Sequence, residues 1–456
     1  MDLANDFARH IVSTTYDDLD DRTRTVTKQF ILDTFATLLG GSTAPGCREV
    51  VDLVKHWGGR KESSILVYGG KVPAPCAALA NGTMAHALDL DDTHDEAVVH
   101  ANISALPAAL AVSEALGGVD GKTFLTAVAL GVDVACRIAL ADRGALRWIL
   151  SATCGVFGSA AAAAKVMGLN EEKTRHALGI AYSQCAGNVQ ALVDGALVKR
   201  MQPAFSSQVG VTAAFLSQRG ITGAREVFEG KYGYYALYSA KPHERERALD
   251  GLGKRFEGVN LSAKQYPSCK CTHAGLDAAL KLAQRLPRDT DIEAVKILTT
   301  RHNFNMVGRP FEWGENLQVS AQFSLPYTVA AALLRKDFFI DDLSEDKIKD
   351  ARVNELARKT TVIPVDDGQN RDLVPATVEV KTSGGHTFQE RVEVVKGHPL
   401  NPLTFEEFKQ KFLKCNQFSA HPLSEKKAQG FIKKVERLEK ISDCRNLVRQ
   451  LKEGKG

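Results

Sequence analysis

The chain has 456 residues, of which 44% are hydrophobic and 25% are charged, and its net charge is +4. This length allows two or three domains with ample cores, and this composition is typical of soluble globular proteins. Lysines near the C-terminus are mixed with glutamates, so the clustered basic face that nucleic-acid binding needs is absent, and no nucleic-acid partner is expected.

The sequence predicts a cytoplasmic protein. The N-terminal segment has early acidic residues and no apolar stretch of signal length, so no secretion signal is expected. No run of 18 or more apolar residues occurs, which predicts no membrane span. The nine cysteines are scattered and only Cys269 and Cys271 lie close together. That spacing is weak as a zinc site, and the scatter suits reduced thiols.

Helices are predicted over most of the first 260 residues. Apolar spacing indicates two helices between residues 3 and 40 and another from Cys47 to Trp57, followed by a short extended segment at 63–75. From Ala77 to about Leu237 small residues dominate, as in GVFGSAAAAAKVMGL. Such residues let helix axes approach closely, which predicts a bundle with buried helices.

After about residue 259 the pattern changes to a mixture of strands and helices. Strands are predicted at DIEAVKILTTR and TTVIPV, and a hairpin at ATVEVKTSGGHTFQERVEVV. Helices are expected around Tyr327, at 344–359, and again between Pro402 and Lys452.

These elements predict a mainly α protein in which a large helical domain is interrupted by a smaller α/β (α+β) lid domain. The predicted boundaries are residues 1–262 for the first part of the helical domain, 263–398 for the lid and 399–456 for the return segment. The cleft between such domains is the usual place for a small ligand.

The segment from Asn81 to Ser104 is the first candidate for chemistry. It combines five acidic residues and three histidines with apolar Ala and Leu, and such groups are costly to bury unless they are paired or used. Asp89 and Thr93 are four residues apart, which on a helix places them on one face. His100 follows after residues that could bend its imidazole back. The alternative is an acidic helix cap with a surface histidine.

A second candidate is the segment VDGALVKRMQPAFSSQVG. Lys199 and Arg200 precede a proline and a helix predicted to begin at about Ser206. Cations beside a helix start could hold an anionic substrate, and the lysine could carry a proton. The alternative is a surface pair.

Two further motifs carry candidate residues. In KQYPSCKCTHAGLDAAL, His273 opens a helix, where the dipole disfavours the charged imidazole and leaves a neutral base. In RPFEWGENLQVSAQFSLPYTVAAAL, Arg309 and Tyr327 are candidates for carboxylate binding and proton donation. The alternatives are a structural histidine, a surface arginine and a core tyrosine.

The order of these motifs, together with GVFGSAAAAAKVMGL, resembles the MmgE/PrpD family over about residues 5 to 440. That family includes 2-methylcitrate dehydratase, cis-aconitate decarboxylase and iminodisuccinate epimerase. The resemblance implies a helical domain with a lid, a homodimer, and a site without metal or cofactor for small di- or tricarboxylates. Family positions correspond to Asp89, Thr93, His100, Lys199, His273 and Tyr327.

The sequence departs from the family pattern at two imidazoles. Many members carry His-Pro before the segment that reads ATCG here, where this chain has Trp148, Ile149 and Leu150. Where some relatives have Lys-x-Leu-His, the fourth position here is Gln202.

The resemblance predicts proton removal or return at a carbon next to a carboxylate, for which a site needs a base and cations that stabilise the enediolate-like charge. Lys199 and Arg200 would bind the carboxylates, His273 and His100 would act as opposed base and acid, and Asp89 would orient an imidazole. Thr93 and Tyr327 would hydrogen-bond the substrate.

Three reactions share this carbanion. A 2-methylcitrate dehydratase-like hydro-lyase is the first expectation, followed by an epimerase and a decarboxylase. A non-catalytic carboxylate-binding dimer is a less favoured alternative, as is a metal-dependent hydratase suggested by His94, His100 and the aspartates.

Overall fold

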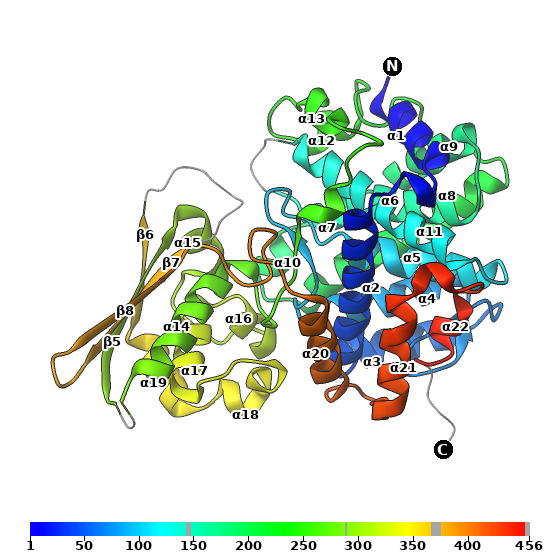
Figure 1. The fold of residues 1–456 in the computed structure, drawn as a ribbon. Helices are drawn as coiled ribbons and strands as arrows, with labels where there is room; N and C mark the ends of the chain where they lie inside the picture. Colours follow the sequence, from blue (N-terminus) through cyan, green and yellow to red (C-terminus); the bar gives the residue numbers. More distant parts are fainter. Residues whose placement is uncertain (143–146, 288–289, 366–374, 452–456) are drawn as a thin grey trace.

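The structure, a computed structural model, describes residues 1–142, 147–287, 290–365 and 375–451. Figure 1 shows a large helical body with a smaller unit beside it that contains a sheet. The helices of the first 260 residues are α1 (Leu3–Ser13), α2 (Asp21–Gly41), α3 (Cys47–Trp57), α4 (Ala74–His86), α5 (Asn102–Ala115), α6 (Gly121–Leu140), α7 (Leu150–Thr153), α8 (Gly155–Val166), α9 (Glu171–Tyr182), α10 (Gln190–Val193), α11 (Gln202–Gln218), α12 (Tyr234–Tyr238) and α13 (Arg245–Leu249).

Small residues let the central helices of this body pack closely, as predicted. Helix α8 contacts both α6 and α11. A Cβ on Gly158 of α8 would lie 2.6 Å from the carbonyl oxygen of Gly131 in α6, which is closer than real Cβ atoms approach. Glycine at this crossing therefore sets the distance between the two helices.

Helix α6 is long and apolar enough to cross a membrane, with a mean hydropathy of 1.7 over an 18-residue window. Within the described residues, however, 94% of that window is buried inside the fold. Two of its three charged side chains, Asp133 and Arg137, are fully buried and form an ion pair of 2.8 Å. We therefore describe α6 as a core helix.

The sheet has the strand order β6-β5-β7-β8, in which β5 and β6 are parallel and the other neighbours are antiparallel. Its strands are β5 (Ile292–Thr300), β6 (Thr360–Val365), β7 (Ala376–Thr382) and β8 (Thr387–Val392), and they lie where the alternating pattern predicted them. The helices around the sheet are α14 (His273–Arg285), α15 (Arg301–Val307), α16 (Leu317–Gln322), α17 (Leu325–Arg335), α18 (Glu345–Ile348) and α19 (Ala351–Arg358).

Two of the predicted helix bounds need correction. The helix expected over 344–359 is two helices, because Asp350 accepts a hydrogen bond from the backbone N–H of Arg352 and so begins α19. Helix α11 begins at Gln202 and not at Ser206, because Pro203 is compatible with the first turn of a helix.

The described residues form two separate hydrophobic cores. The first draws on residues 3–263 and 339–451, and the second on residues 266–395. The chain returns to the first core through α20 (Phe405–Asn416), α21 (Glu425–Glu436) and α22 (Arg445–Val448), and α20 and α21 contact α2 (Figure 1). The predicted helical end at Lys452 lies outside the described residues. The boundaries at 262/263 and 398/399, and the action of the smaller unit as a lid, stay predictions.

Two pairs of short strands lie outside this sheet: β1 (Ser63–Ser64) with β2 (Lys71–Val72), and β3 (Thr93–His94) with β4 (Leu261–Ser262). The second pair matters for the site, because it connects the segment between α4 and α5 to residues 261–262, which lie far along the chain.

Candidate active site

The acidic segment between α4 and α5 is a buried loop. The expectation that Asp89 and Thr93 share one face of a helix is wrong, because α4 ends at His86 and Asp89 has a φ of +52°. A run of aspartates would be unfavourable at the negative end of the α4 dipole, and Asp is among the residues that tolerate the left-handed conformation. The loop instead turns back and places its polar side chains around one pocket.

Three successive carbonyl groups fix the path of this loop. Each accepts a hydrogen bond of 2.6 to 2.9 Å from a buried side chain far along the chain: Leu88 from Gln322, Asp89 from Lys264 and Leu90 from Lys411. A buried carbonyl without a partner is costly, so these donors stabilise a backbone conformation that makes no regular ladder.

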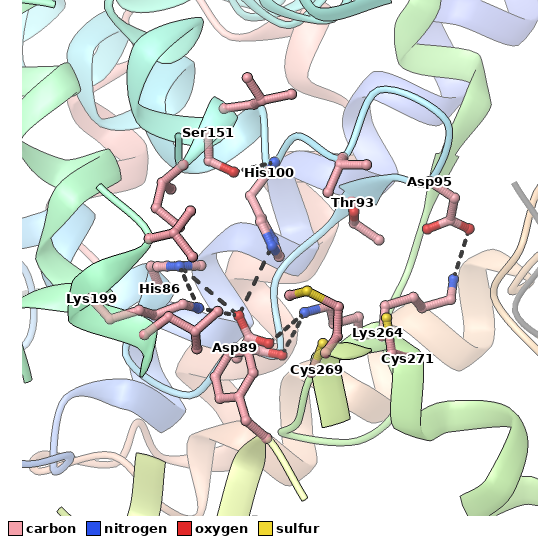
Figure 2. A pocket seen from close by; sticks show the side chains of 18 of the residues that line it. His86, Asp89, Thr93, Asp95, His100, Ser151, Lys199, Lys264, Cys269 and Cys271 are labelled. Atoms are coloured by element: carbon pink, nitrogen blue, oxygen red, sulfur yellow. Dashed lines mark hydrogen bonds and ion pairs between the residues drawn. The ribbon is translucent and has the colours of Figure 1, made fainter. Parts of the chain in front are cut away.

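Asp89 lies between two buried ammonium groups. Its Oδ1 is 2.7 Å from Lys199 Nζ and its Oδ2 is 3.0 Å from Lys264 Nζ (Figure 2). Burial alone would raise the pKa of Asp89, but the two lysines hold that pKa well below its usual range. Burial would likewise lower the pKa of Lys264, and the carboxylates of Asp89 and Asp91 raise it instead. Asp89 and Lys264 therefore remain charged.

Asp91 holds two imidazoles at once. Both of its oxygens hydrogen-bond with Nδ1 of His86 at 3.0 Å, and its Oδ2 lies 3.0 Å from Nδ1 of His100, an ion-pair distance without hydrogen-bond geometry. Burial, together with the charge of Lys199, lowers the pKa of His86 to about 4, so this imidazole is neutral near pH 7. A neutral His86 with its proton on Nδ1 leaves Nε2 as the acceptor that faces Lys199 Nζ at 3.2 Å.

His100 is the more accessible of the two imidazoles. Its side chain is 18% exposed, against 1% for His86, and the two rings meet edge to face with centroids 4.9 Å apart. Its backbone N–H donates to the Ser151 hydroxyl, and its Nε2 lies 3.9 Å from Asp89 Oδ1 (Figure 2). The edge of His100 that bears Nε2 is thus available to a ligand.

These groups line a pocket of about 140 Å³. Its polar lining includes His86, Asp89, Thr93, Asp95, His100, Ser151, Lys199, Lys264 and Lys270. Its remaining lining includes Val98, Trp148, Ile149, Leu150, Val189, Leu192, Cys269, Cys271, His302, Met306 and Phe323. A pocket of this size that combines ammonium, carboxylate and imidazole groups suits a small acid.

Four of the predicted site residues, Asp89, Thr93, His100 and Lys199, line this pocket. His273 and Arg200 do not. His273 does open α14 as predicted, but it is 1% exposed and its Nε2 lies 3.3 Å from the carbonyl oxygen of Ser268. Arg200 is 2% exposed and donates to the Pro45 carbonyl and the Gln318 side chain.

Tyr327 and Arg309 are also outside the pocket lining. Tyr327 belongs to the second hydrophobic core, is fully buried, and donates its hydroxyl to the carbonyl oxygen of Asp342 at 2.7 Å. Arg309 is an exposed residue that follows α15. Neither position supports the predicted contact with a substrate.

Sequence reasoning missed His86, Asp91, Lys264 and the pair formed by Lys270 and Asp95, whose charged atoms are 3.0 Å apart. His86 and Asp91 lie in the segment already singled out for its density of ionisable groups. Lys264 is the first residue of the motif KQYPSCKCTH, and only its burial and its contact with Asp89, 175 residues earlier, reveal its role.

Four side chains could be considered as metal ligands: His86, Asp89, Asp91 and His100 each offer an atom within 4.8 Å of the others. Each oxygen of Asp89 already has a lysine ammonium group within 3.0 Å. A divalent cation at this position would meet strong repulsion from both ammonium groups, so the donor set fits a metal ion poorly.

The buried position of Tyr327 leads to a test. Replacing it by phenylalanine is expected to leave the turnover rate unchanged and to lower the free energy of unfolding by about 1 kcal/mol, because the Asp342 carbonyl loses its donor. Steady-state rates and urea unfolding measure the two effects. A large loss of rate in a folded variant would show that Tyr327 does contribute to the reaction.

Asp92 gives a pH-dependent prediction. It is fully buried, accepts hydrogen bonds from the backbone N–H groups of Ala101 and Asn102, and burial beside Asp91 raises its pKa to about 7. The folded state therefore binds the Asp92 proton more tightly than the unfolded state, and this stabilisation is lost as the pH rises from about 4 to 7.

The Asp92→Asn variant has no carboxyl group at this position, so it does not lose this stabilisation as the pH rises. Its stability relative to the wild type is expected to increase by about 3 kcal/mol between pH 4.5 and pH 8, measured by urea unfolding. His86, with a lowered pKa, acts with the opposite sign in this range, but both proteins contain it and its effect cancels. A difference that does not change with pH would contradict the assignment.

Comparison with known proteins agrees with this architecture. The sequence matches the MmgE/PrpD N-terminal domain over residues 5–246 and the MmgE/PrpD C-terminal domain over residues 266–440. It is 28% identical to cis-aconitate decarboxylase of Homo sapiens, in an alignment that covers 99% of this chain and 94% of the relative.

Two fungal proteins are also similar. Identity is 26% with the cis-aconitate decarboxylase-like protein oryM of Aspergillus oryzae, over 85% of each chain. It is 28% with cis-aconitate decarboxylase of Aspergillus terreus, over 80% of this chain and 79% of the relative. The two domain matches together span most of the sequence, in the order that the structure places its two cores, and the chain therefore belongs to the MmgE/PrpD family.

Proposed function

We propose that this protein is a lyase that moves a proton at the carbon next to a carboxylate of a small di- or tricarboxylic acid. The observation that carries the proposal is the position of Asp91 between Nδ1 of His86 and Nδ1 of His100. The charge of a carboxylate beside Nδ1 favours a proton on that nitrogen, so that Nε2 can accept or deliver a proton.

In this proposal His100 is the proton carrier, because its ring is the more accessible one. Lys199 and Lys264 bind the substrate carboxylate and stabilise the enediolate-like charge that develops when the neighbouring carbon loses its proton. Asp89 keeps both ammonium groups in place, and Thr93 donates a hydrogen bond to the substrate. His273, which is buried and does not line the pocket, is not assigned a proton transfer.

Loss of CO₂ is the first candidate outcome, because the relatives named above are cis-aconitate decarboxylases or resemble one. In such a reaction the carbon–carbon bond to the leaving carboxylate breaks and its electron pair moves toward the carbon that His100 protonates. The reaction needs no metal in this proposal, since Asp89 is held by lysines, and a chelator is expected to leave the rate unchanged.

Loss of water, as in a 2-methylcitrate dehydratase, is the second candidate. It needs an acid that protonates the departing hydroxyl group, and Lys270 lines the same pocket. Burial lowers the pKa of Lys270, although Asp95 opposes this effect, and a lowered pKa makes an ammonium group a better proton donor.

Proton NMR in D₂O with 2-methylcitrate, citrate, cis-aconitate, malate, tartrate and iminodisuccinate tests the proposal. A product one carbon shorter identifies a decarboxylase, and new vinyl signals without that loss identify a dehydratase. Deuterium that enters beside a carboxylate with no other change identifies an epimerase. An acid that binds in calorimetry but never exchanges its proton would instead support a binding protein.

The homodimer and the cytoplasmic location are also proposals. Phe205, Val209 and Leu216 form an exposed or half-buried apolar face on α11, which a second copy could cover. All nine cysteines are free thiols, as a reducing compartment would keep them. Light scattering is expected to give twice the 49.5 kDa of one chain, and Leu216→Glu is expected to shift the protein to the monomer.

A further inference from the structure

One part of the pocket lining has no role in the proposed proton transfer. It is the apolar wall, which we define as Trp148, Ile149, Leu150, Val189 and Leu192. Its first three residues come from the segment that leads into α7, and the last two come from the segment around α10. Two segments some 40 positions apart in the sequence thus bring five apolar side chains to the same pocket, and Ser151 follows directly after the first three.

The wall is a surface that a ligand can reach. Trp148, Ile149, Val189 and Leu192 are each partly exposed in the described structure, whereas a residue that only filled the core would be buried. The Trp148 ring is supported from behind by Tyr238, with ring centroids 4.9 Å apart. Apolar surface left open beside a cluster of charges costs free energy unless something apolar covers it.

The charged side of the pocket holds three lysines against two aspartates. Lys199 and Lys264 lie within 3.0 Å of Asp89, and Lys270 lies 3.0 Å from Asp95. These lysines can bind the carboxylates of one end of a small acid. A further carboxylate placed against the apolar wall would lose its hydration and gain no cation in return.

From these observations we propose that the natural substrate carries its carboxylates at one end and an apolar alkyl arm at the other, with the arm against the apolar wall. The inference rests on the proposed function for the carboxylate end of the site. It adds a substrate class, namely alkyl-substituted polycarboxylic acids, in which the length of the arm contributes to affinity.

A series of succinates that carry hydrogen, methyl, propyl, butyl or hexyl at C2 tests this inference by calorimetry. Each methylene that the wall covers is expected to lower Kd by about fourfold, until the wall is filled. A Kd that stays constant or rises along the series would overturn the inference. This measurement records binding alone, so it is independent of whether any of these acids reacts.

Helix α10 offers a matched pair of variants. Leu192 lines the pocket, and its neighbour Val193 is 61% exposed and does not. Leu192→Asn is expected to weaken binding of hexylsuccinate by about tenfold and to leave succinate unchanged, because only the alkyl arm meets the wall. Val193→Asn is expected to change neither Kd. Equal effects of the two variants on hexylsuccinate would contradict the inference.

Tryptophan fluorescence provides a second readout that does not depend on variants of α10. The chain has three tryptophans, and Trp57 and Trp313 are 55% and 56% exposed while Trp148 lines the pocket. Hexylsuccinate is expected to shift the emission to shorter wavelength, and Trp148→Phe is expected to abolish the shift. If the NMR panel shows no proton exchange but these binding results hold, the proposed reaction fails and the alkyl-binding wall remains. If proton exchange occurs but Kd stays constant along the succinate series, only the inference about the apolar wall is wrong.

Discussion

Replacing Lys199 by methionine is expected to lower kcat/KM by about 10²–10³-fold, because the site loses a preorganised ammonium group at the position where negative charge develops. Lys199 Nζ contacts both Asp89 and His86, so its loss also leaves Asp89 with a single cation. Methionine keeps most of the volume of the lysine side chain, which limits the effect on packing. Turnover of the acid that reacts in the NMR panel measures the change.

Arg200 supplies the matched control for Lys199. Both residues lie in the short helical segment Leu197–Met201 and both are buried. Changing either one to methionine removes a buried cation from the protein. Only Lys199 lines the pocket. Both variants are expected to unfold at lower temperature, but Arg200→Met is expected to keep its rate at temperatures where it is folded. Equal losses of rate would show that Lys199 acts only on stability.

Asp91→Asn is expected to lower kcat by roughly 10³–10⁴-fold. An asparagine amide would face Nδ1 of the imidazoles with N–H groups, and this favours the tautomer whose proton is on Nε2. His100 can then accept no proton at Nε2, and the imidazolium that would deliver one loses the carboxylate that stabilises it. The pH–rate profile should change together with the rate, because burial would raise the pKa of Asp91 and the two imidazoles now hold it below its usual range.

Asp92→Asn is the control for that change, one residue along the same loop. Asp92 bonds to backbone N–H groups and not to an imidazole, so this variant is expected to keep its rate while its stability varies with pH as described. If Asp91→Asn stayed within tenfold of the wild type, the proposed role of the two imidazoles would be wrong.

The sequence predicted the elements of the fold where local pattern determines structure. The strand at 292–300, the hairpin that follows at 376–392 and the helix that His273 opens all lie where periodicity and turn residues placed them. The loop at 87–101 could not be predicted in this way, because its conformation depends on donors from residues 264, 322 and 411.

The candidate site could likewise be predicted only where the local sequence pattern reveals it. Asp89, His100 and Lys199 stand out because ionisable residues gather in apolar segments. Lys264 does not stand out, because a buried lysine and a surface lysine look alike in a sequence. Tyr327 was a candidate from its motif and from the resemblance, and its hydroxyl direction is set by Asp342, which the pattern around Tyr327 does not contain.

The three successive carbonyl groups at residues 88–90, which accept hydrogen bonds from residues far along the chain, have a consequence for biosynthesis. Every residue that lines the pocket precedes residue 324, yet the donor to the Leu90 carbonyl is Lys411 on α20. A nascent chain that has emerged as far as α19 already contains the complete pocket lining, but the loop that carries Asp89 and Asp91 still lacks one of its three supports. The protein therefore acquires its working site only when about nine tenths of the chain has been made and α20 has docked beside α2.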